Sequence, residues 1–190
     1  MGTRRRRCAV VGCVLVVIVA GWAGPSRAAG RTPVPPKEWL TDVCSATRAW
    51  VREVERAATQ AQESFADEAL TEGPLTALLR FLGVAAEATQ TLTAAAEDAG
   101  VPDGRGGRDV ARTLVQTLDA VETGFRDTQR DLAPLRASTD PAAIATGVAG
   151  ARARVDAAIS TGLGALDDAV GSGALARTAI RVRACRAISG

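Results

Sequence analysis

The sequence predicts an all-α protein: an up-down bundle of four helices with a short C-terminal fifth helix, cross-linked by one disulfide. Three observations lead to this fold class. Four long segments carry apolar residues at alternating steps of three and four, which is the spacing of one helix face. Strand-favouring aromatic residues are scarce, with 3 Phe, 3 Trp and no Tyr. Beyond the N-terminal segment only two cysteines remain, Cys44 and Cys185, near opposite ends of the chain.

The N-terminal segment, residues 1–28, has the pattern of a signal peptide. "MGTRRRR" is basic, Cys8 to Gly24 is an apolar run, and Ser26 and Ala28 are the small residues of a cleavage site. We expect cleavage after Ala28. The alternative is an uncleaved signal anchor, in which residues 8–24 alone would contact the membrane. Both alternatives place the remaining chain outside the cytoplasmic membrane, as a secreted or cell-envelope protein.

Removal of this segment changes the charge of the chain. The whole sequence has 23 basic and 21 acidic residues, a net charge of +2. Five of the basic residues belong to the signal segment, so the rest of the chain has 18 basic and 21 acidic residues and a net charge of −3. The basic excess is therefore part of the signal, and we expect no nucleic-acid partner.

A proline-rich linker, residues 29–36, precedes the domain, since successive prolines disfavour a helix. The bundle domain is expected over residues 37–190. A first helix starts near Lys37 and fades at residues 67–71, and a second runs from Pro74 in its first turn to Gly100 at its end. Their apolar stripes are Leu40, Val43, Thr47, Trp50, Val54, Ala57 and Ala61 in the first, and Leu75, Leu78, Leu79, Leu82, Ala86 and Leu92 in the second.

The second half begins with "VPDGRGGRD", which predicts a loop; its glycines lack the preceding strand and the Gly-Lys-Ser/Thr ending of a phosphate-binding loop. A third helix is expected over residues 107–135, with Pro134 marking its end. A fourth follows Asp140 as N-cap and Pro141 as first helical residue. "GSG" ends it, and a short last helix spans residues 174–188. The stripes are Val110, Leu114, Leu118, Val121, Phe125, Leu132 and Leu135, then Ile144, Val148, Ala151, Val155, Ile159, Leu163, Leu166 and Val170.

The two remaining cysteines predict a disulfide, because paired cysteines in an exported chain are commonly oxidised. In an up-down bundle the fourth helix finishes at the end where the first one starts. This topology brings Cys185 close to Cys44, which lies about two turns into the first helix. The alternatives are a reactive thiol and a metal site, and the metal site is disfavoured since the chain has no His and two thiolates alone make a poor zinc site.

Catalytic chemistry has few candidates in this sequence. Without His, the Ser-His-Asp and Cys-His arrangements and the Glu-x-x-His motif of di-iron bundles are excluded. A Ser-Lys pair would need Lys37, the single lysine. Adjacent carboxylates occur at Asp67/Glu68, Glu97/Asp98 and Asp167/Asp168, and neighbours in sequence point to different sides of a helix. We expect no enzyme activity, no cofactor and no metal.

Two kinds of residue are candidates for partner contacts. Trp39 and Trp50 lie about three turns apart on one helix face; both can pack in the core, or Trp39 can be an exposed anchor for a partner. Arg177, Arg181, Arg183 and Arg186 make the last helix basic. They can favour a helix C-terminus, or they can contact anionic envelope polymers or lipid headgroups.

The pattern of "WLTDVCSA" (39–46), four Ala-rich helices and a final "ACRAISG" (184–190) after an export signal resembles a group of small secreted or envelope-associated helical proteins of actinobacteria, of unknown function. The resemblance implies location and shape and brings no catalytic residues. We therefore expect an exported, non-catalytic helical bundle that acts through protein or cell-envelope contacts. The alternative is a carrier of a small apolar or lipid ligand between the helices.

Overall fold

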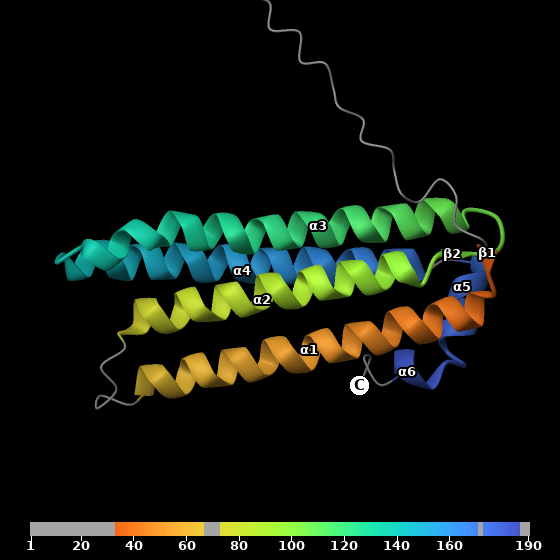
Figure 1. Ribbon diagram of the computed structural model, residues 1–190, viewed down its shortest axis with the longest axis horizontal. Helices are drawn as coiled ribbons and strands as arrows, with labels where there is room; N and C mark the ends of the chain where they lie inside the picture. The colour runs from red at the N-terminus through yellow and green to blue at the C-terminus, as the bar shows by residue number, and fades with distance from the viewer. Residues whose placement is uncertain (1–32, 67–72, 171–172, 187–190) are drawn as a thin grey trace, which may run out of the picture.

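Four long helices run up and down the molecule, and the predicted all-α fold class is confirmed (Figure 1). The computed structural model describes residues 33–66, 73–170 and 173–186. The predicted signal segment and the end of the first predicted helix beyond residue 66 lie outside these ranges. The four helices are α1 (Pro36–Ala66), α2 (Pro74–Asp98), α3 (Gly107–Leu132) and α4 (Pro141–Val170).

Prolines and short polar side chains determine where these helices begin and end. Pro36, Pro74 and Pro141 each stand in a first turn, where no backbone N–H is needed. Asp140 acts as the predicted N-cap, because its Oδ1 accepts a hydrogen bond from the Ala142 N–H at 2.9 Å. The third helix was expected to continue to residue 135. Its α-form ends at Leu132 instead, and the chain tightens into a 3₁₀ turn, η2 (Ala133–Ala137), around Pro134.

A small parallel pairing joins the predicted linker to the predicted loop. β1 (Pro33–Val34) pairs with β2 (Val101–Pro102), and the Asp103 N–H donates a hydrogen bond to the Val34 carbonyl oxygen at 2.8 Å. Gly107 packs directly under this pairing: a Cβ there would lie 1.8 Å from the Pro102 carbonyl oxygen. Periodicity could not predict this contact, since each strand has only two residues.

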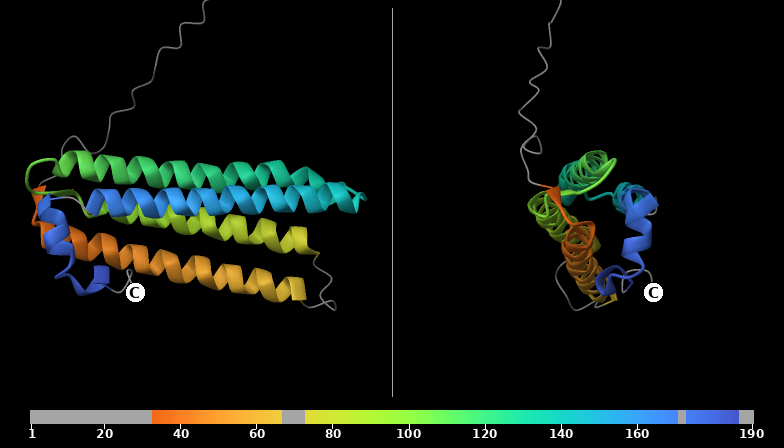
Figure 2. Two further views of the ribbon diagram at one scale, coloured as in Figure 1. Left: turned by 180° about the vertical axis from the view of Figure 1, so that it is seen from behind. Right: turned by 90° about the vertical axis from the view of Figure 1, so that its right-hand side faces the viewer.

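The last predicted helix is divided in two. α5 (Gly173–Ala179) and α6 (Arg183–Arg186) are separated by a turn at residues 180–182, and residues 187–190 lie outside the described chain. The turn changes the direction of the chain, and α6 lies against α1 (Figure 2). Val182 and Cys185 are both buried by this arrangement. A straight helix over residues 174–188 was therefore wrong, because the turn is what brings Cys185 to α1.

The helices pack in sequence order but do not close into a ring. α2 packs along both α1 and α3, and α3 packs along α4. Within the described residues, α4 and α1 do not pack along one another. α5 and α6 instead cross from α4 to α1 at one end of the molecule, as the right-hand view of Figure 2 shows. The bundle thus has three packed sides and a fourth side that is covered at one end.

Candidate functional site

The covered end of the fourth side is held by the predicted disulfide. Cys44 of α1 and Cys185 of α6 are bonded, with their Cα atoms 5.0 Å apart, and both side chains are buried. The prediction from helix parity is confirmed. Because disulfides persist in oxidising compartments, the bond points to a location outside the cytoplasm.

Trp39 belongs to the core and is no exposed anchor. Its side chain is 0% exposed, and its indole Nε1–H donates a hydrogen bond to the Gly100 carbonyl oxygen at 3.2 Å. This bond connects the first turn of α1 to the end of α2. Trp50 is buried as well, and its Nε1–H donates to Thr89 Oγ1 at 3.0 Å. Of the two interpretations of Trp39, core packing is correct and partner contact is wrong, because no surface of the indole reaches solvent.

The open part of the fourth side is a groove between α1 and α4 with a volume of about 470 Å³. Its floor is apolar and comes from three helices. Val54, Ala58 and Ala61 lie on α1, Leu78 and Phe81 on α2, and Val155 and Ile159 on α4. The volume and the largely apolar lining fall within the range typical of small-molecule sites.

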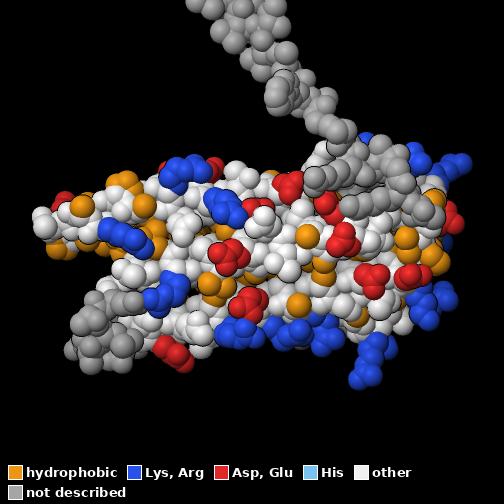
Figure 3. All heavy atoms as spheres, in the orientation of Figure 1, with side chains coloured by type: hydrophobic (Ala, Val, Ile, Leu, Met, Phe, Trp, Pro, Cys, Tyr) orange, Lys and Arg blue, Asp and Glu red, His pale blue; other side chains and the backbone are white. Residues whose placement is uncertain are grey.

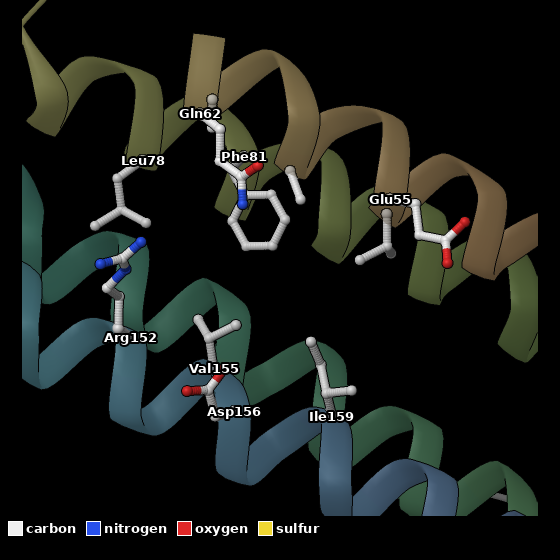
Figure 4. Close-up of a pocket in the computed structure, with 11 residues that line it drawn as sticks. Glu55, Gln62, Leu78, Phe81, Arg152, Val155, Asp156 and Ile159 are labelled. Carbon is white, nitrogen blue, oxygen red and sulfur yellow. The ribbon is translucent and has the colours of Figure 1, made fainter. Parts of the chain in front are cut away.

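Polar side chains stand on the rims of this groove. Figure 4 shows Glu55 and Gln62 on the α1 side, opposite Arg152 and Asp156 on the α4 side, with Phe81 between the two helices. Glu55, Arg152 and Asp156 are exposed, and none of them forms an ion pair with another described residue. The groove therefore offers an apolar floor with one cation and two anions at its edges.

The few candidate catalytic groups of the sequence are Lys37 and three pairs of adjacent carboxylates, and the structure describes only some of them. Lys37 is exposed beside the β1 segment, and Glu97 and Asp98 are neighbours at the end of α2. Asp67 and Glu68 lie outside the described residues, as do the side chains of Asp167 and Asp168. In the part of the chain that the structure describes, no group of three or more Cys, Asp or Glu side chains is placed to hold a metal ion.

Asp119 of α3 is a titratable group that sequence reasoning missed. Desolvation raises the pKa of its carboxyl group above 3.8, and the nearby carboxylates of Glu122 and Glu97 raise it further. Glu97 comes from a different helix, so spacing within α3 could not reveal the effect. Glu122 is held by Arg126, with Oε1 2.7 Å from Nε. The cluster lies on the outside of α3 and adds no group to the groove.

The two arginines predicted as partner contacts are both on the surface. Arg177 lies in the last turn of α5, and Arg181 lies in the turn that follows. The structure brings them to the covered end of the fourth side, near the disulfide and away from the groove. Their role stays a prediction, since the structure contains no partner.

The sequence interpretation allowed an apolar slot between the helices but did not place it between α1 and α4, although it identified most of the residues of the floor. Val54, Ala61, Leu78, Val155 and Ile159 all lie on the predicted apolar stripes, where they were assigned to the core. The rim residues carried no signal, because exposed charges beside a stripe are normal for any helix. The floor and rim residues line a groove because α1 and α4 stand apart.

Comparison of the chain with protein-family models, with curated proteins and with solved structures finds no match. The resemblance to actinobacterial envelope proteins therefore stays a prediction. Among the described helices, none combines the length and the apolar character needed to cross a bilayer.

Proposed function

We propose that this is an exported, non-catalytic binding protein whose groove between α1 and α4 holds an elongated apolar ligand with an acidic head, such as a fatty acid. The observation that carries the proposal is the apolar floor of a groove left where α4 stands away from α1. The disulfide and the signal pattern support export. This is the carrier alternative of the sequence interpretation, and it is favoured because the fourth side of the bundle is not closed.

The size of the groove favours an acyl chain over a helix of a partner protein. Its lining runs from Val54 to Gln62 on α1 and from Arg152 to Ile159 on α4, lengths of about 12 Å and 10 Å. A helix with its side chains is about 10–12 Å wide, so a 12 Å length occupies roughly 900 Å³ or more. That is about twice the volume of the groove, so a helix could insert only one face, whereas an acyl chain is narrow enough to lie wholly along the floor.

The rims also favour a ligand with one polar end. Arg152 is exposed at the edge of the apolar floor, beside Leu78 and opposite Gln62 (Figure 4). A carboxylate or phosphate head placed there would gain a charge-assisted hydrogen bond from the guanidinium group. Glu55 and Asp156 stand farther along the rims and would repel an anionic head, so they favour one orientation of the ligand.

The proposal is tested by fatty-acid binding with a groove-filling variant. Ala58→Phe places a ring over the floor, whereas Ala120→Phe places the same ring on the exposed surface of α3. After removal of lipid, the parent chain and Ala120→Phe are expected to bind palmitate in native mass spectrometry, and Ala58→Phe is expected to lose it. Circular dichroism checks that both variants fold. Palmitate binding by Ala58→Phe equal to that of the parent chain, or no binding by the parent chain, would show that the groove does not hold a fatty acid.

A further inference from the structure

Ile180 stands out on the surface of the covered end. It is 69% exposed, and it is the one large apolar side chain with such exposure among the described residues. It lies in the turn between α5 and α6. Leu175, Ala179 and Val182 of the same segment face inward and pack against or within the core. The outward position of Ile180 is therefore no consequence of a loose segment, because the opposite side of that segment is anchored.

Arginines surround this exposed isoleucine. The Ile180 N–H still bonds to the Ala176 carbonyl oxygen in helical fashion, so Arg177, three residues earlier, lies on the same side. Arg181 and Arg183 follow it, and all three arginines are exposed. None of the three forms an ion pair with an acidic side chain of the described chain, and the sequence from residue 169 to residue 190 contains no Asp or Glu.

The basic surface extends from this corner onto α1. The disulfide holds α6 against α1 at Cys44, and Arg48 and Arg52 follow Cys44 at steps of four on one side of the helix. Figure 3 shows Lys and Arg side chains gathered along the lower edge of the molecule, over α1 and α6. The predicted mature chain has a net charge of −3, so this concentration of positive charge is local.

The described chain also begins at this end of the molecule. β1 starts at Pro33, at the same end of the bundle as α5 (Figure 1). If residues 8–24 stay in the membrane as an anchor, residues 25–32 can span at most about 28 Å between the bilayer and β1. That end of the bundle, which includes the α5–α6 corner, would then be kept close to the membrane.

We propose that Ile180, Arg177, Arg181 and Arg183 form a docking surface for a bilayer of anionic phospholipids. The isoleucine enters the boundary between headgroups and acyl chains, and the three guanidinium groups bind the phosphates around it. Positive charge alone would also suit a soluble polyanion. The exposed isoleucine in the same segment as these arginines favours the bilayer, because burying Ile180 lowers the free energy only where apolar chains are available.

The test measures how the exported chain without its signal segment, residues 29–190, partitions onto vesicles. The assay is co-sedimentation at physiological salt. The vesicles are phosphatidylcholine alone or phosphatidylcholine mixed with phosphatidylglycerol. We expect tighter binding to the anionic vesicles. Arg177→Ala/Arg181→Ala should weaken that binding about 25-fold, at about fivefold for each arginine, and Ile180→Ser about tenfold or more. All three side chains are exposed, so folding is expected to survive both changes.

A matched control removes two exposed arginines elsewhere. Arg136→Ala/Arg154→Ala changes the net charge equally, at η2 and α4, and is expected to alter the partition less than about twofold because such distant charges are screened. The inference is wrong if this control weakens binding as much as Arg177→Ala/Arg181→Ala, or if lipid charge has no effect. It is also wrong if Ile180→Ser binds as the parent chain does, which would mean that the arginines bind anionic groups without insertion of the isoleucine. Ala58→Phe should leave vesicle binding unchanged, so the groove and the docking surface can fail separately.

Discussion

Removing the disulfide should cost this fold much of its stability. Cys44 and Cys185 are separated by 141 positions, so the bond closes a loop that contains most of the bundle. In the chain-entropy model a loop of this length stabilises the folded state by about 5 kcal/mol, through restriction of the unfolded chain. A single domain of this size has a total stability of roughly 5–15 kcal/mol. The double variant Cys44→Ala/Cys185→Ala is therefore expected to be folded only marginally.

Guanidinium chloride unfolding, followed by circular dichroism, measures the effect. With a slope of about 4 kcal/mol per molar denaturant, the loss of 5 kcal/mol lowers the midpoint by about 1.2 M. The parent chain under reducing conditions is the matched control and should unfold near the midpoint of the variant. A free energy of unfolding within about 1 kcal/mol of the oxidised parent would refute the reasoning, since it would mean that the loop contributes almost no entropy to the unfolded state.

Two further substitutions test a buried hydrogen bond of α2, at Thr89, and a carboxylate on the outer face of α3, at Asp119. Thr89→Val removes the acceptor of the buried Trp50 Nε1–H and should lower the free energy of unfolding by about 1–3 kcal/mol, whereas Thr91→Val, at an exposed position of the same helix, should change it little. Denaturant midpoints decide between these outcomes, and equal midpoints would mean that the Trp50–Thr89 bond adds nothing. Asp119→Asn should raise the melting temperature at neutral pH. Because the folded-state pKa of Asp119 is raised above 3.8, ionisation destabilises the fold as pH rises through that pKa, and the gain should vanish at about pH 3. A gain that persists in acid would exclude this cause.

The helices and the disulfide were predictable because both depend on local or topological rules. Apolar periodicity identified α1 to α4, and proline positions placed the starts of α2 and α4. Cys44 and Cys185 could be paired from the number of helices alone. An up-down chain with an even number of long helices must return to its starting end, whatever its side chains do.

The partner of a buried polar group was much harder to predict. Trp39 lies on a helix face that suits a core residue or an exposed anchor equally. Its environment depends on the Gly100 carbonyl oxygen, a backbone atom 61 residues away. Nothing in the spacing of α1 marks that atom. The same is true of the pairing between β1 and β2, which depends on the path of two loops.

The place of the groove could not be predicted, because it depends on a distance between helices. The stripes of α1 and α4 have the same period whether these helices touch or stand apart. In the structure α2 and α3 connect α1 to α4 along the bundle, and α5 packs against both α1 and α4 at one end only. The sequence shows the short C-terminal segment but contains no rule for where it lies.

The long separation of the two cysteines also affects how the molecule tolerates proteolysis. An exported protein is exposed to proteases, and a peptide bond that they cut is not re-formed. A single cut at any peptide bond between Cys44 and Cys185 leaves the two fragments joined through sulfur, as one covalent molecule. All of α2, α3 and α4 fall within this protected interval. A nicked molecule would thus keep the helices that form its core at high effective concentration, and re-forming the bundle would be an intramolecular step.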